Sequence, residues 1–309
     1  MLKKIITALS VMLFAVLLGT VSYANSDGPK ITSPSLYSEY KAAAPVTVRW
    51  TKPPSDHDVV DHYVIAVRGF QKEEDVTKAT AGSVIVNLTL QSTELTTTIS
   101  GSTLKSYYEN SKFRKYRISV CAVTVEDKKR WSDHVYFYSS AHNTPADEPV
   151  SFHIYNGFAQ ESKDQIYYAC QLWNNTLNIG REIANTYPYS MGTDLQGYDL
   201  EDGINVVTIK NVPKDALMTT HHRDSTTTHK AIQIDIVVNK AYEWSSTPQS
   251  EKYYFYSSMV HEMGHVVGLI DKYDSWAEEW TMYGRTVKGE SKRTTLENQD
   301  ILNAKSLYK

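Results

Sequence analysis

The stretch VHEMGHVVGLIDKYD, residues 260–274, decides how this sequence is interpreted. Residues in an α-helix advance by about 100° each, so His261 and His265 project from one face, one turn apart. Two imidazoles in that arrangement can hold one zinc ion, each at about 2.0–2.1 Å. Glu262 is rotated away from that line, and we expect it to take a proton from a water at the metal rather than to bind the metal. The stretch therefore predicts a catalytic zinc helix.

A catalytic zinc ion needs a third protein ligand and one open position. The helix is expected to end after Val267, because Gly268 supplies the permissive backbone with which a chain turns away from a helix. Asp271 follows three residues later and is the expected third ligand. Asp274, three residues further along the chain, is the weaker candidate.

The alternative interpretation is an ordinary amphipathic helix with two solvated histidines. HExxH alone can arise by chance, but a glycine and an aspartate at fixed offsets make a chance match rare, which favours the zinc site. Upstream, Thr247 is expected to cap the helix and Pro248 to occupy its first position. Its buried face is expected to hold the apolar residues at helical spacing, Phe255, Met259, Met263 and Val266.

The same residues resemble the HExxHxxGxx(H/D) pattern of the metzincin metallopeptidases. TMYG, residues 281–284, is similar to the Met-turn of that clan, which implies that Met282 lies beneath the metal. Residues 295–308 resemble the closing helix of the matrixin branch, and residues 234–244 resemble the strand and bend before its zinc helix. The resemblance implies an α/β catalytic domain, one catalytic Zn²⁺ and a peptide or protein substrate.

Aspartate at position 271 departs from the matrixins, most of which have histidine there, and agrees with the small snapalysin-type proteases. Residues 218–230, MTTHHRDSTTTHK, are comparable to a region where matrixins bind a structural zinc ion. The spacing fits loosely, so a polar loop is favoured over a second metal site. The segment is also expected near an edge strand that pairs with substrate. The candidate ligands of the second metal are His221, His222, Asp224 and His229.

The remainder of the C-terminal region, residues 151–309, mixes strands and helices. A short strand is expected at residues 151–157, and a helix within residues 160–180 with Gly180 as its stop. Two further strands are expected at residues 203–212 and 230–244. This order predicts an α/β domain.

Residues 25–142 are expected to form an all-β sandwich without helical stretches. Residues 115–126 alternate as in a half-buried strand. Trp50, YRISVCAV (116–123) and RWSD (130–133) occur in an order that resembles a fibronectin type III domain. That resemblance implies a spacing or adhesion role and leaves open a contact with a surface or polymer. The expected strands are residues 46–50, 61–70, 83–90, 94–100, 115–126 and 134–140.

Residues 1–24 are expected to be a secretory signal peptide, because a basic start and an apolar run precede Ser22-Tyr23-Ala24. The alternative is an uncleaved membrane anchor. Residues 143–150 are expected to be a linker.

The net charge is −3, with basic residues scattered, so neither nucleic acid nor an anionic membrane is an expected partner. The two cysteines, Cys121 and Cys170, are expected to be buried free thiols, and a disulfide bond between them is the alternative.

These features predict a secreted zinc endopeptidase with a multi-domain architecture. One rival is a non-catalytic extracellular binding protein whose C-terminal domain is a metal-stabilised scaffold. A scaffold has no need of Glu262, which argues against that rival. A second rival is a metallohydrolase that acts on non-peptide amides, which the Met-turn resemblance disfavours.

Overall fold

The computed structural model describes residues 27–41, 44–54, 59–71, 82–111, 113–140, 148–186, 201–212, 215–225 and 230–308. It divides into two compact units. The sandwich unit comprises Met1–Leu36 and Pro45–Phe137, and the C-terminal unit comprises Tyr37–Ala44 and Tyr138–Lys309. The expected signal peptide, most of the expected linker and His229 lie outside the described residues.

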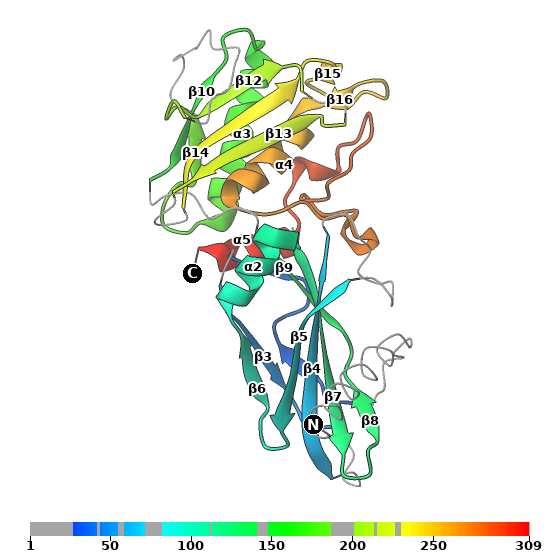
Figure 1. Cartoon of the computed structure of the whole chain (residues 1–309). Coiled ribbons are helices and arrows are strands. Elements are labelled where there is room, and N and C mark those ends of the chain that lie inside the picture. The colour runs from blue at the N-terminus through cyan, green and yellow to red at the C-terminus, as the bar shows by residue number, and fades with distance from the viewer. Residues whose placement is uncertain are drawn as a thin grey trace. The chain divides into compact units, whose positions relative to one another are not determined.

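Two antiparallel sheets build the sandwich unit (Figure 1). The first has the order β1-β3-β6, and the second has the order β9-β7-β4-β5, with β8 paired to β7. Their bounds are β1 Ile31–Ser33, β3 Val46–Trp50, β4 Val60–Phe70, β5 Ser83–Gln91, β6 Thr96–Ile99, β7 Lys115–Thr124, β8 Lys129–Trp131 and β9 Val135–Ser139. The buried rings of Trp50 and Tyr63 meet edge to face across the two sheets, with centroids 5.5 Å apart. The predicted β-sandwich is confirmed.

Two details of the sandwich unit differ from the prediction. A helix, α2 Gly101–Ser111, follows β6, and Ser100 caps it by accepting a hydrogen bond from the Thr103 N–H at 3.1 Å. All ten residues of β7 are buried rather than every second one. The outer face of β7 is covered because Cys121 and Val123 pack with Val64 and Trp131 in a second apolar cluster.

The C-terminal unit contains a mixed sheet with the order β11-β10-β12-β14-β13, in which only the edge strand β13 is antiparallel to its neighbour. Helices α3 and α4 lie behind this sheet in the view of Figure 1 and pack against each other. The bounds are β10 Val150–Ile154, α3 Gln160–Leu177, β11 Ala184–Thr186, β12 Val206–Lys210, β13 Met218–Asp224, β14 Ala231–Asn239, β15 Trp244–Ser245, β16 Tyr253–Tyr254, α4 Phe255–Val267 and α5 Asn298–Leu307.

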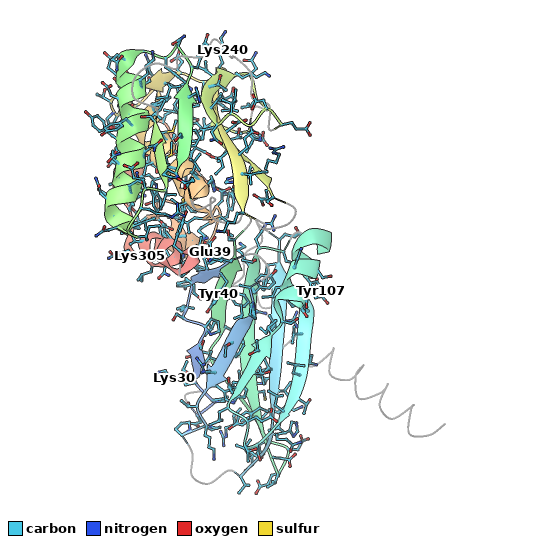
Figure 2. The ribbon with its side chains drawn as sticks, turned by 90° about the vertical axis from the view of Figure 1, so that its left-hand side faces the viewer. Lys30, Glu39, Tyr40, Tyr107, Lys240 and Lys305 are labelled. Carbon is cyan, nitrogen blue, oxygen red and sulfur yellow. The ribbon has the colours of Figure 1, made fainter. Side chains whose placement is uncertain are left out.

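A short strand from the beginning of the chain, β2 Ser38–Tyr40, completes the C-terminal unit. Glu39 of β2 lies next to α5, the helix that carries Lys305 (Figure 2). The sequence instead predicts this segment as part of the sandwich, residues 25–142. The sequence SLYSEYK contains no local feature that distinguishes the two possibilities, because Ile270 and Lys272, which bind Glu39, lie more than 200 positions away.

Three predictions for the C-terminal unit are wrong in detail. Residues 218–224 are the edge strand β13 rather than part of a polar loop, because each pairs with β14. Helix α4 begins at Phe255 rather than at Pro248, because β15 and β16 pair with each other and hold the intervening residues in a turn. Helix α3 ends at Leu177, where Asn178 adopts the left-handed cap conformation that was expected of Gly180.

The core of the C-terminal unit joins both helices to the sheet. The expected face of α4 is buried: Phe255, Met259, Met263 and Val266 all belong to this core. Trp173 of α3 packs in the same core and donates its indole N–H to the Val260 carbonyl of α4 at 2.8 Å. The zinc-helix candidate is therefore held on the core side by a dense apolar layer.

Cys121 and Cys170 are both buried free thiols, so the alternative of a bond between them is wrong. Among the described residues, no helix is both long and apolar enough to span a bilayer.

Candidate metal centre

The end of α4 directs Asp271 back toward the two histidines. Gly268 caps the helix with a φ of +111°, a left-handed conformation that favours glycine. Its N–H donates to the His265 carbonyl at 2.9 Å, and the Leu269 N–H donates to the Gly264 carbonyl at 3.0 Å. These two bonds close the last turn, and the chain then doubles back, as the sequence predicted.

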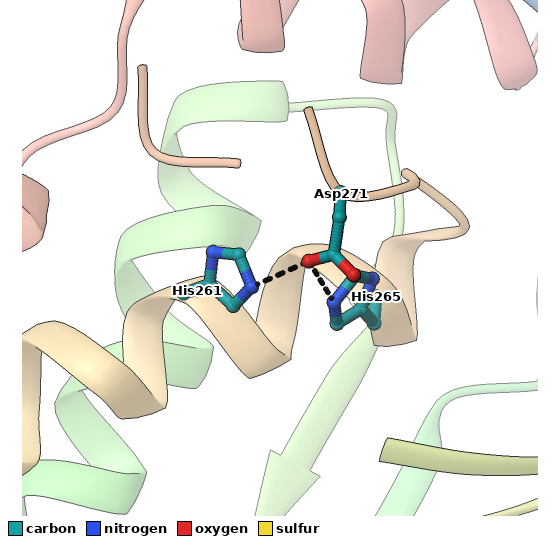
Figure 3. A group of neighbouring side chains, drawn as sticks. All are labelled: His261, His265 and Asp271. Atoms are coloured by element: carbon teal, nitrogen blue, oxygen red, sulfur yellow. Dashed lines mark hydrogen bonds and ion pairs between the residues drawn. The ribbon is translucent and has the colours of Figure 1, made fainter. Parts of the chain in front are cut away.

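The side chains of His261, His265 and Asp271 converge on one point (Figure 3). The Asp271 Oδ1 atom lies 3.0 Å from His261 Nε2 and 3.1 Å from His265 Nε2. All three ligand atoms lie within 4.8 Å of one another. Ligand atoms around a tetrahedral zinc ion with bonds of about 2.0–2.1 Å are separated by roughly 3.3 Å. The two distances from Asp271 Oδ1 differ from that separation by a few tenths of an ångström, so the donor set fits zinc.

Each imidazole faces an oxygen acceptor at both of its nitrogens. The Nδ1 atom of His261 lies 2.8 Å from the Thr281 carbonyl, and Nδ1 of His265 lies 2.8 Å from the Leu269 carbonyl. A neutral imidazole carries a single N–H, so a carbonyl at Nδ1 leaves Nε2 with a lone pair aimed at Asp271. Each Nε2 therefore needs either an additional proton or a cation between itself and the carboxylate.

The pKa values of Asp271 and His265 are displaced in opposite directions. Burial raises the pKa of Asp271, but the charge on His265 and hydrogen bonds from both imidazoles outweigh it and hold the pKa well below its ordinary value. Burial lowers the pKa of His265, but the Asp271 carboxylate outweighs it and raises the pKa to about 9. The group thus favours positive charge at its centre, which protons or a divalent cation can supply.

The Glu262 side chain is held by the edge strand β13. This side chain is buried, and its Oε2 atom accepts a hydrogen bond from the Thr220 hydroxyl on β13 at 2.6 Å. The Thr220 hydroxyl also lies 3.3 Å from the Glu262 carbonyl. Sequence reasoning did not single out Thr220, because only the pairing of β13 with β14 brings it to α4.

Met282 packs against the helix between the two histidines. A Cβ atom on Gly264 would lie 2.1 Å from the Met282 sulfur, so the methionine fills the place of that missing side chain. The Met282 N–H donates to the Asp300 Oδ2 atom at 3.2 Å, and burial raises the pKa of Asp300 to about 7. The preceding residue supplies the carbonyl that meets His261, so the segment around Met282 supports the ligands directly.

The other candidate ligands lie elsewhere. Asp274 is buried and accepts a hydrogen bond from the Tyr138 hydroxyl at 3.0 Å, outside the three-residue group. His221 of β13 has its Nε2 atom 2.9 Å from the Thr219 hydroxyl. Within the part of the chain that the structure describes, His222 and Asp224 do not join His221 in a group that could hold a metal.

Comparison with known proteins gives no family for this chain. No protein-family model matches it, and no curated protein matches it. The fibronectin(III)-like modules of Clostridium thermocellum CbhA match at 13% identity and a TM-score of 0.24, over 36% of this chain and 93% of theirs. A fibronectin type III domain of human fibronectin type III domain containing protein 3 matches at 19% identity and a TM-score of 0.26, over 42% and 97%. Pectate lyase PelI from Erwinia chrysanthemi matches at 14% identity and a TM-score of 0.23, over 41% and 31%.

Proposed function

We propose that this protein is an exported zinc-dependent endopeptidase of the metzincin type. The observation that carries the proposal is the convergence of His261, His265 and Asp271 at the end of one helix, with Glu262 buried beside them. A purely structural metal site has no use for a buried carboxylate that does not bind the ion. Two histidines and one carboxylate are also a known ligand set of catalytic zinc sites, which keep one position open.

Zinc, when bound, supplies Lewis acidity for a carbonyl and lowers the pKa of water. Glu262 is the proposed general base, which accepts a proton from the attacking water and delivers it to the leaving amine nitrogen. Thr220 holds the Glu262 carboxylate in one orientation through the bond to Oε2. The carbonyls of Thr281 and Leu269 hold the two imidazoles with Nε2 toward the centre.

The edge strand β13 supports a peptide as the substrate. It is the last strand in the sheet order, and Thr220 places it beside Glu262. Extended peptides bind proteins by adding a strand to such an edge, which aligns a backbone amide with catalytic groups. A pocket of about 530 Å³ lies in the segment between α4 and α5 and is lined by Glu278, Tyr283 and residues 287–292. It is a candidate site for one substrate side chain.

The proposal includes export and a separate role for the sandwich unit. The basic start and the apolar run of residues 1–24 support secretion. The two-sheet architecture and the order of Trp50, residues 116–123 and residues 130–133 support a domain of the fibronectin type III kind. We propose that this unit spaces the enzyme from a surface or polymer rather than taking part in the chemistry.

Product sequencing after incubation with a diverse peptide pool tests the activity. We expect the wild type to cleave peptide bonds and a chelator to stop the cleavage. Glu262→Ala is expected to lower the rate by about 10²- to 10⁴-fold while its zinc content stays at one ion per chain. Glu161→Ala, at an exposed position on α3, serves as the control and is expected to retain full activity.

Three outcomes would refute the proposal. A Glu262→Ala protein with undiminished cleavage would exclude the proposed base. A wild-type protein that binds zinc but cleaves no peptide would favour the scaffold, and cleavage of non-peptide amides alone would favour the amidase.

A further inference from the structure

Both neighbours of Asp271 in the chain are bound to one buried carboxylate, that of Glu39. The Glu39 Oε1 atom accepts the Ile270 N–H at 3.1 Å, and its Oε2 atom accepts the ammonium group of Lys272. Lys272 also donates to the Ile270 carbonyl at 3.2 Å. The residues before and after the candidate ligand are therefore fixed to a common point, which leaves Asp271 little freedom to turn away.

The surroundings of this ion pair exclude water. The side chains of Glu39 and Lys272 are both 0% exposed. The ring of Tyr138 covers the ammonium group, with its centroid 4.2 Å from Nζ. Ser306 of α5 donates its hydroxyl to the Glu39 carbonyl at 2.8 Å, which holds the backbone of β2 in place. A buried charge without its partner is strongly unfavourable, so the two side chains must stay together.

The clamp extends to the segment around Met282. The Lys272 N–H donates to the Met282 carbonyl at 2.7 Å, and the Gly284 N–H donates to the Lys272 carbonyl at 2.8 Å. The same segment supplies the Thr281 carbonyl that orients His261. Glu39 thus anchors the backbone that carries one ligand and, through it, the backbone that orients another.

We infer that Glu39 is a positioning residue that pre-orients Asp271 for the metal, although it touches neither the ion nor the substrate. The inference rests on the proposed zinc site. Residues that orient metal ligands typically contribute 10- to 100-fold to metal affinity. The functional C-terminal unit therefore requires a segment, residues 37–44, that lies in the sequence between the two parts of the sandwich unit.

The test measures zinc affinity of the full mature chain by competition with a chromophoric chelator, together with the absorption spectrum of the Co²⁺-loaded protein. We expect Glu39→Gln to weaken zinc binding by 10- to 100-fold and to alter the Co²⁺ spectrum. Glu126→Gln is the control, because Glu126 forms an exposed ion pair with Lys128 at 2.7 Å in the sandwich unit. It is expected to bind zinc as the wild type does.

A double variant, Glu39→Met with Lys272→Met, separates positioning from folding. Replacing both charges with apolar side chains of similar size leaves no unpaired buried charge, so this variant is expected to fold. It lacks the clamp and is expected to bind zinc as weakly as Glu39→Gln. A folded double variant with wild-type zinc affinity and Co²⁺ spectrum would overturn the inference. A wild-type chain that binds no zinc would overturn both proposals, whereas zinc binding without peptide cleavage would overturn only the proposed activity.

Discussion

The contact between Gly264 and Met282 predicts that Gly264→Ala changes the free energy of unfolding in opposite directions when Met282 is present and when it is replaced by alanine. In an ordinary helix interior, replacing glycine by alanine stabilises by about 1 kcal/mol. In this helix the new Cβ would lie 2.1 Å from the Met282 sulfur and 3.1 Å from Cζ2 of Trp173, where ordinary contacts are 3.4–4 Å. Both neighbours are buried, and overpacking of this kind typically costs about 1–3 kcal/mol.

The gain in helix propensity offsets part of this cost. We therefore expect Gly264→Ala to destabilise the otherwise wild-type protein by up to about 2 kcal/mol. In a Met282→Ala background the methionine no longer obstructs the new Cβ and only the milder contact with Trp173 remains, so the same substitution is expected to stabilise by up to about 1 kcal/mol. The coupling energy between the two positions is then about 1–3 kcal/mol. Equilibrium denaturation of the four metal-free proteins in urea measures it.

Gly264→Ala is also expected to weaken zinc binding, because a displaced Met282 moves the adjacent carbonyl that orients His261. Additive effects of Gly264→Ala and Met282→Ala on the free energy of unfolding would refute this reasoning. So would a Gly264→Ala protein that is more stable than the wild type, since the methionine would then not occupy the space beside the glycine.

Three further predictions concern single residues. Asp271→Ala should abolish zinc binding while Asp274→Ala retains it, as measured by metal content after dialysis, and the reverse result would contradict the assigned ligand set. Thr220→Val should lower kcat by about tenfold with little change in KM, because it removes a hydrogen bond to a carboxylate, whereas Thr220→Ser should restore the rate. Burial raises the pKa of Asp300 to about 7 from an ordinary value of 3.8, so its contribution to stability is complete below about pH 4 and is lost as the pH rises to 7. Asp300→Asn should therefore gain stability relative to the wild type over that pH range, by up to about 4 kcal/mol in denaturant titrations, and a constant difference between the two proteins would contradict this account.

The parts of the candidate site that the sequence predicted depend on local geometry. Helical periodicity was enough to place His261 and His265 together, and Gly268 was enough to predict the turn that returns Asp271 to them. The start of the same helix was wrong, although Thr247 and Pro248 are suitable residues for one. Pairing between β15 and β16 overrides that local preference, and nothing within the segment itself reveals the pairing.

The supporting residues of the site were out of reach for a different reason. Thr220 meets Glu262 from 42 positions away, and Glu39 meets Lys272 from 233 positions away. Neither residue belongs to a motif, and a glutamate in a short polar strand is most often solvated. β-branched residues and turn residues predicted most strands of the sandwich, but they did not predict α2. The serine that caps this helix, Ser100, is also the last residue of a segment with the composition of a strand, residues 94–100.

The large sequence separation between Glu39 and Lys272 affects the order in which parts of the chain fold during synthesis. A ribosome delivers Glu39 long before Lys272, and residues 45–137 can collapse into their own core during that interval. Closing so long a loop is entropically unfavourable and slow relative to local folding. The pairing of Glu39 with Lys272 would then be a late event of biogenesis, and the candidate metal centre would be complete only after most of the chain has been synthesised.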